Sequence, residues 1–122
     1  MKAKTLAVGL LTLCLFYSFG CGPETHLAVG DTGTIVSKDS VFAAMDRPSY
    51  EGYVNALHTD DKVAQVNFMV HGSVFSLRAG TKVTVLLSYM YSGSTVYKVR
   101  VLDGLHEGEE VFVNFFFVEK SK

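Results

Sequence analysis

The last apolar segment of the chain, residues 111–118 (VFVNFFFV), constrains the fold more than any other part of the sequence. Successive side chains of a β-strand point to opposite faces, so this segment would place valines and phenylalanines on both faces, interrupted only by Asn114. One hydrophobic core cannot bury both faces, and such a strand needs a second covering layer. We therefore expect helices to pack on the face that carries Phe112 and Phe116. An exposed aromatic patch that binds a partner is the alternative.

The covering layer is predicted at residues 47–71, where the hydrophobic period changes. Asp46 is available as an N-cap and Pro48 falls in the first turn. Apolar side chains then recur at helical spacing, at Tyr50, Tyr53, Val54 and Leu57. Gly52 weakens this helix by up to ~1 kcal/mol. Residues 60–71 have acidic residues in a first turn and a glycine after them, which suits a second helix, but their alternation suits a strand equally. A helical hairpin packed on the sheet is the expected arrangement.

Most of the remaining chain is predicted to form short strands separated by turns. The expected strands are residues 34–36, 74–77, 82–91, 95–102 and 111–118. Ser92-Gly93 is the turn of a hairpin between the two longest strands. Residues 40–45 either continue the first strand or lead into the helices. Gly30 and Gly33 mark a turn around Asp31.

Alternation along the hairpin predicts which of its side chains are buried. The residues expected on the buried face are Val83, Val85 and Leu87 in the first arm and Tyr97, Val99 and Val101 in the second. Lys98 and Arg100 then point to solvent.

Three segments of the second half resemble the bacterial Src-homology-3-like domains. They are GTKVTVL at 80–86, VYKVRVLDG at 96–104, and a closing strand after a glycine-bearing loop. The resemblance implies a small five-stranded barrel, here mainly β with a helical insert (α+β), that covers residues 28–120. It also implies a non-catalytic module that binds peptides or cell-wall material, or that holds other parts together. The family commonly has Gly-Trp-Val before its last strand, where this chain has Glu110-Val111-Phe112.

The N-terminus has the pattern of a bacterial export signal. Two lysines precede an uncharged, largely apolar run, residues 5–19, which is too short to cross a bilayer comfortably as a permanent helix. Gly20-Cys21 resembles the end of the lipobox of bacterial lipoproteins, whereas Ser18 and Gly20 also suit an ordinary signal peptidase. We expect residues 1–20 to form a signal helix that is removed, Cys21 to receive a lipid, and residues 21–27 to tether the domain to a membrane.

Cysteine and charge usage agree with an exported lipoprotein. Cys14 lies within the signal, so the processed chain keeps Cys21 alone. A lone exposed thiol would pair between molecules in an oxidising compartment, and attachment of a lipid removes that hazard. The formal net charge is −1, and loss of Lys2 and Lys4 makes the chain more acidic. The absence of a basic run argues against nucleic acid as a partner.

The candidate site residues are few, and no metal or cofactor is expected. His58, Asp60 and Asp61 (HTDD) come nearest to an acid/base or metal cluster, but capping of a helix by Thr59 or Asp60 explains them more simply. Aromatic side chains near a loop tip commonly grip extended peptides. The best candidates for ligand contact are therefore Tyr89 and Tyr91, beside the Ser92-Gly93 turn.

These observations predict a non-enzymatic lipoprotein, anchored through Cys21 to a bacterial membrane and facing the periplasm or the cell exterior. Its expected partners are the membrane and either an envelope protein or a cell-wall polymer. A soluble secreted form is the alternative location. A small exported enzyme or metal-binding protein that uses His58, Asp60 and Asp61 is the alternative function.

Overall fold

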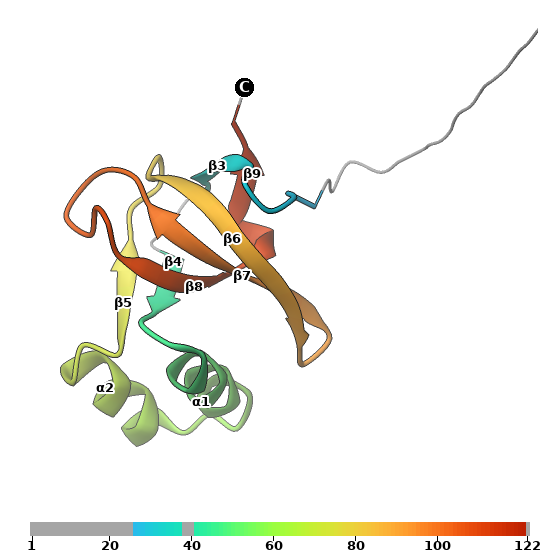
Figure 1. The fold of residues 1–122 in the computed structure, drawn as a ribbon. Coiled ribbons are helices and arrows are strands. Elements are labelled where there is room, and N and C mark those ends of the chain that lie inside the picture. The colour runs from blue at the N-terminus through green and yellow to red at the C-terminus, as the bar shows by residue number, and fades with distance from the viewer. Residues whose placement is uncertain (1–25, 38–40, 122) are drawn as a thin grey trace, which may run out of the picture.

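The computed structural model describes residues 26–37 and 41–121 (Figure 1). The predicted signal peptide, Cys21 and all but the end of the predicted tether lie outside these residues. The elements are, in chain order, β3 (Thr32–Ile35), β4 (Val41–Ala44), α1 (Arg47–His58), α2 (Lys62–Val70), β5 (Val74–Leu77), β6 (Lys82–Tyr91), β7 (Ser94–Val101), β8 (Glu110–Asn114), the 3₁₀ helix η2 (Phe115–Phe117) and β9 (Val118–Lys120). Among the described residues, no helix is long and apolar enough to span a bilayer.

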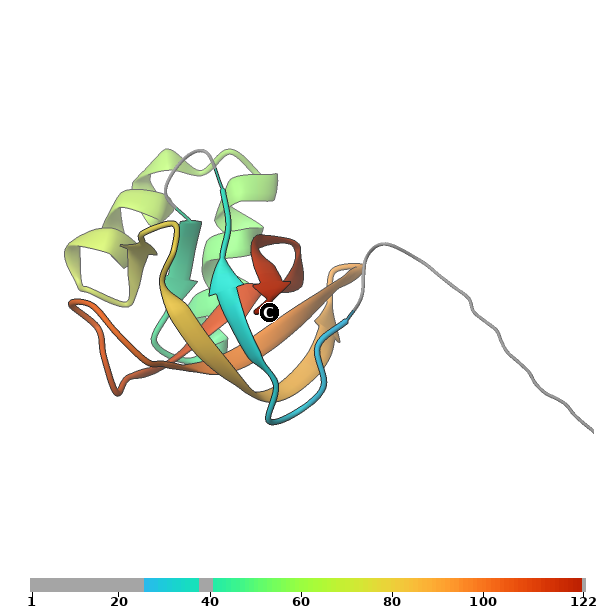
Figure 2. The ribbon, with the colours of Figure 1, turned by 90° about the horizontal axis from the view of Figure 1, so that it is seen from above.

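The strands form one antiparallel sheet of seven strands in the order β5-β4-β8-β7-β6-β3-β9. The sheet curls into a half-barrel, and the two helices lie together on one side of it (Figure 2). The domain is therefore mainly β with a helical insert, as the sequence predicts. Residues 40–45 were expected either to continue the first strand or to lead into the helices, and residues 41–44 instead form a separate strand, β4, which pairs with β5 and β8.

The β6–β7 hairpin is the longest paired segment, and its turn is as predicted. Ser92 and Gly93 both have positive φ, at 53° and 82°, which is the backbone of a tight two-residue hairpin turn. The pairing register shifts between Val85 and Leu87, so a β-bulge interrupts the alternation of β6. Val83 and Val85 are buried as predicted, but Leu87 is 41% exposed because the bulge turns it away.

Two hydrophobic cores lie on the two faces of the sheet. The larger core fills the inside of the curl and includes Val111 and Val113, together with the predicted inner face of β7. The smaller core lies between the sheet and α1, where Phe112 packs with Tyr50 and Tyr53. The prediction that β8 needs a covering layer on each face is therefore confirmed.

The end of the predicted last strand differs from the prediction. A single strand was expected over residues 111–118, but β8 ends at Asn114 and the chain forms η2 before it resumes as β9. The Asn114 side chain accepts a hydrogen bond from the Phe116 amide at 2.9 Å, which favours a turn over an extended strand. The prediction that helices cover Phe116 is consequently wrong, because Phe116 is 75% exposed.

Both predicted helices form, and the strand alternative for residues 60–71 is wrong. Asp46 caps α1 by accepting a hydrogen bond from the Ser49 amide at 2.8 Å, as expected. Asp61, rather than Thr59 or Asp60, caps α2 by accepting from the Ala64 amide at 3.1 Å. None of the residues of α2 is buried, and its apolar side chains Val63, Val66, Met69 and Val70 are all exposed.

One glycine forms a turn, and two others allow close contacts between elements. Gly30, with φ of 92°, lies in the turn before β3, as predicted. Gly33 belongs to β3 instead of the turn, and a Cβ there would lie 2.6 Å from Val118 of β9. In α1, a Cβ on Gly52 would lie 2.6 Å from the ring of Phe68 in α2. Gly52 lowers the helix propensity of α1, but its lack of a side chain leaves the space in which Phe68 of α2 packs.

Candidate functional site

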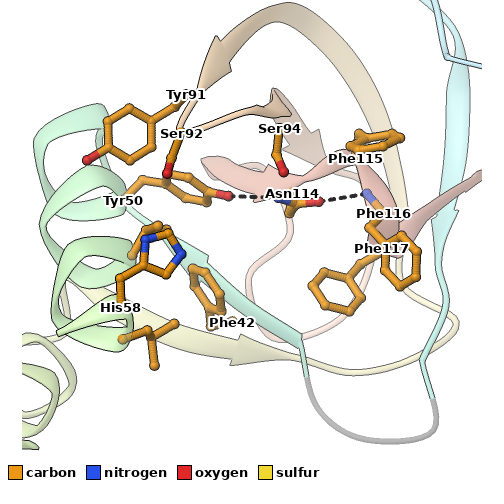
Figure 3. A pocket seen from close by; sticks show the side chains of 12 residues that line it. Phe42, Tyr50, His58, Tyr91, Ser92, Ser94, Asn114, Phe115, Phe116 and Phe117 are labelled. Atoms are coloured by element: carbon orange, nitrogen blue, oxygen red, sulfur yellow. Dashed lines mark hydrogen bonds between the residues drawn. The ribbon is translucent and has the colours of Figure 1, made fainter. Parts of the chain in front are cut away.

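A cleft of about 330 Å³ lies between α1, the tip of the β6–β7 hairpin and η2 (Figure 3). Its lining comes from segments that are far apart in the sequence. The lining residues are Phe42, Tyr50, Val54, Leu57, His58, Tyr91, Ser92, Ser94, Asn114, Phe115, Phe116 and Phe117. In Figure 3 the three phenylalanines of η2 lie across the cleft from α1.

Asn114 joins the two sides of the cleft. Its side-chain amide nitrogen donates to the Tyr50 hydroxyl over 3.4 Å, and its oxygen accepts from the Phe116 amide. Figure 3 shows both hydrogen bonds in line across the floor of the cleft. One side chain therefore fixes the position of η2 relative to α1.

The Tyr50 hydroxyl is neutral, is buried, and accepts its hydrogen bond from Asn114. Burial raises the pKa of Tyr50 above its ordinary value of 10.0, and the hydrogen bond from Asn114 only partly opposes that effect. Because the hydroxyl oxygen accepts from Asn114, its own hydrogen is left to donate to another group. Tyr50 is only 1% exposed, so its hydroxyl supports the floor of the cleft through Asn114.

The walls suit an uncharged ligand with apolar groups. Seven of the lining side chains are phenylalanine, valine, leucine or tyrosine groups from α1, β4 and η2, and the remainder offer hydroxyl, amide or imidazole groups. No aspartate, glutamate, lysine or arginine lines the cleft within the part of the chain that the structure describes. Clefts with apolar walls and a few placed polar groups bind ligands through shape and one or two hydrogen bonds.

Of the two predicted ligand-contact residues, Tyr91 lines the cleft and Tyr89 does not. The Tyr91 hydroxyl donates to the Glu51 carbonyl at 3.3 Å, and its ring meets Tyr50 edge-on. Tyr91 therefore holds the hairpin tip against α1 while it exposes part of its ring to the cleft.

Tyr89 lies deeper in the contact between the hairpin and α1. Arg47 lies over its ring, 3.9 Å from the centroid, and Phe112 meets it edge-on. Its hydroxyl is buried, with no hydrogen-bond partner among the described residues. Burial raises the pKa of Tyr89 to about 12, although the positive charge of Arg47 acts in the opposite direction. Tyr89 is thus a packing residue in this structure.

The predicted His58, Asp60 and Asp61 cluster is divided among separate tasks. His58 lines the cleft, Asp60 pairs with Lys62 at the surface over 2.8 Å, and Asp61 caps α2. Residues 26–37 and 41–121 contain no group of three or more histidine, cysteine, aspartate or glutamate side chains suited to a metal ion.

Two further histidines, His71 and His106, have separate contacts of their own. His71 contacts the Asn67 carbonyl at the end of α2. His106 stacks on Phe75, with its ring nitrogen 3.1 Å from a Glu109 carboxylate oxygen.

Sequence reasoning missed most of the cleft. Phe42 was assigned to an ambiguous segment, and the η2 phenylalanines were assigned to a strand. Asn114 was the available signal, since it is the one polar residue in an otherwise apolar run and asparagine favours turns.

Comparison with known proteins gives this geometry no family context. No protein-family model matches the chain, and no curated protein or solved structure matches it either.

Proposed function

We propose that this chain is a non-enzymatic lipoprotein, anchored through Cys21 to a bacterial membrane, whose domain binds an envelope protein or a cell-wall polymer. The observation that supports binding is the cleft itself, with aromatic walls and a floor held by the hydrogen bond between Asn114 and Tyr50. Its lining of uncharged groups suits an extended, apolar or amphipathic segment more than a charged metabolite. Tyr91, one of the two predicted contact residues, is part of this proposed site.

The proposed domain type is a Src-homology-3-like barrel with an insert. Five of the strands are consecutive neighbours, in the order β9-β3-β6-β7-β8. Strands β3 and β6 pair directly with each other. The segment between them in the chain contains β4, α1, α2 and β5. This arrangement supports a five-stranded unit to which the insert adds two strands and the helical cover.

The alternative enzyme or metal protein has less support. Asp60 and Asp61 are occupied by an ion pair and a helix cap, and neither lines the cleft with His58. We therefore do not extend the proposal to catalysis or metal binding.

The anchor is tested by replacing the cysteine in the native host. We expect Cys21→Ser to move the protein from the membrane fraction to the soluble fraction, because it removes the sulfur that would carry the lipid. Mass spectrometry of the processed wild-type N-terminus should show a lipid-modified Cys21. Cys14→Ser is the matched control and should leave the protein in the membrane. Unchanged membrane retention of Cys21→Ser, or an unmodified Cys21 in the wild type, would contradict the anchor.

The cleft is tested by filling it. Ser94 lines the cleft, and Ser94→Gln adds bulk there, whereas Ser88→Gln makes the same change at an exposed position of β6 outside the lining. The full processed protein is sedimented with purified cell-wall sacculi and, separately, applied to an array of unstructured peptides. We expect wild type and Ser88→Gln to bind one of these probes, and Ser94→Gln to bind at least about tenfold more weakly, equivalent to ~1.4 kcal/mol. Equal binding by the two variants would exclude the cleft as the site.

A further inference from the structure

We infer that Phe116, at the exposed corner of η2, contacts the lipid bilayer beside the anchor and thereby orients the domain on the membrane. This inference rests on the proposed attachment of a lipid to Cys21. It adds an interaction surface that the lipid does not by itself require, since attachment through one residue does not set the orientation of the domain.

Phe116 is presented to solvent by a fixed turn. The hydrogen bond from its amide to Asn114 sets the backbone, and its ring packs edge-on against Phe117, 5.6 Å away between centroids. Phe115 and Phe117 both pack against the larger core, so they hold the turn from inside. The result is a large aromatic side chain that is 75% exposed on a constrained segment, which suits contact with an apolar phase.

The start of the described chain lies beside this turn. The ring of His26 contacts the ring of Phe115, with centroids 4.8 Å apart. Cys21 precedes His26 by five residues, and a fully extended chain of that length spans at most about 18 Å. A lipid on Cys21 would therefore hold His26, and with it the turn that its ring contacts, close to the bilayer surface.

Anchoring makes a weak contact effective. One phenylalanine does not retain a soluble protein on a membrane, but a tethered side chain experiences a high local concentration of lipid. Phe116 is therefore expected to select an orientation rather than to recruit the protein. Because Phe116 also lines the cleft, this orientation keeps one rim of the cleft close to the membrane.

Two other exposed apolar regions, the loop between β7 and β8 and helix α2, are less suited to this contact. The loop between β7 and β8 carries Leu105, which is 93% exposed, but that loop lies on the side of the domain away from the start of the described chain (Figures 1 and 2). Helix α2, whose large apolar side chains are exposed, likewise lies away from the start of the described chain (Figures 1 and 2). These positions provide internal controls.

Tryptophan fluorescence tests the inference, because the chain contains no tryptophan of its own. The full processed protein, purified from the native host as Phe116→Trp or as the control Leu105→Trp, is reconstituted into phosphatidylglycerol–phosphatidylethanolamine vesicles. We expect the emission of Phe116→Trp to shift to shorter wavelength and to be quenched by acyl-brominated lipid. Leu105→Trp should show neither effect. A third variant, Phe116→Ser, should keep its membrane anchorage while its domain orientation becomes less uniform.

Each contrary outcome has a distinct meaning. Mass spectrometry of the same samples reports the state of Cys21, so an unlipidated cysteine would overturn both the proposed anchor and this contact. A lipidated Phe116→Trp protein whose emission is neither shifted nor quenched would overturn the bilayer contact alone. An emission shift that is present without vesicles would assign Phe116 to a protein interface or a second copy, and would also overturn the inference.

Discussion

At the scale of single residues, two buried tyrosine hydroxyls differ in one respect. The Tyr97 hydroxyl accepts a hydrogen bond from the Leu27 amide at 2.8 Å, across 70 positions of sequence. The Tyr89 hydroxyl is buried without a partner among the described residues. A buried polar group without a partner loses its hydration and gains nothing in return. The same chemical change at these positions should therefore have opposite consequences.

We expect Tyr89→Phe to leave the free energy of unfolding unchanged or to raise it by up to about 1 kcal/mol, because it removes an unpaired hydroxyl. Its stability should also depend less on high pH. The pKa of Tyr89 is about 12 in the folded protein against 10.0 ordinarily, so the wild type loses stability as the pH rises through that interval. Urea titrations between pH 8 and pH 12 measure both effects.

Tyr97→Phe is the matched control, because it deletes the same atom where the atom has a partner. It leaves the Leu27 amide without an acceptor and should lower the free energy of unfolding by about 1–3 kcal/mol. A loss of similar size in Tyr89→Phe would mean that its hydroxyl has a partner, such as a bound water, and would contradict the description of Tyr89 as unsatisfied.

Residue chemistry also explains the limits of the sequence-based site prediction. Tyr89 and Tyr91 are two residues apart on β6. Both are aromatic and lie beside the turn, so the sequence predicted both equally as ligand-contact residues. Their difference arises from long-range contacts: Arg47 covers Tyr89, whereas Tyr91 reaches Glu51 and the cleft. A sequence pattern gives the type and spacing of side chains, but it does not show which distant residues each side chain contacts in the fold.

At the scale of elements, α1 and α2 meet through one small and one large residue. The ring of Phe68 in α2 occupies the space that a side chain at position 52 would need. Phe68 also meets Tyr53 edge-on, with centroids 6.2 Å apart. Because the large apolar residues Val63, Val66, Met69 and Val70 of α2 are exposed, the attachment of α2 depends heavily on this contact.

We expect Gly52→Ala to destabilise the wild-type protein by about 1–2 kcal/mol, because overpacking against Phe68 exceeds the gain in helix propensity. In a Phe68→Leu background, where the ring is absent, the same change should instead stabilise by up to ~1 kcal/mol. Thermal or urea unfolding of the four proteins gives the coupling energy directly. Additive effects of the two substitutions would contradict the importance of this contact.

The elements themselves were predictable to different degrees. The hairpin, its turn and the cap of α1 follow from local sequence, since each depends on residues within a few positions. The bulge that exposes Leu87 and the break after Asn114 do not follow from alternation, because each is a local departure from it. Segment 60–71 was ambiguous by period alone, and the hydrogen bond of Asp61 to the first turn accounts for its helical form.

At the scale of the whole molecule, the two-layer arrangement was predictable from a single strand. The alternating valines and phenylalanine of β8 require cover on both faces, and the two cores supply it. The order of the strands was not predictable, because β4 joins the sheet beside β8 although about seventy residues separate them. The cleft follows from that topology, since β4, α1, the hairpin and η2 come together only when the sheet has formed.

The pairing of β3 with β9 has a consequence for how the protein is made. β3 is the first strand of the described chain and β9 is the last, and they form an antiparallel pair from Gly33 opposite Lys120 to Ile35 opposite Val118. A nascent polypeptide cannot complete this sheet until β9 has left the ribosome, and contacts between distant segments form slowly. Synthesis of the segment between β3 and β9 therefore sets an interval during which the sheet is incomplete, and under the proposed export the chain would meet its translocation channel in that interval.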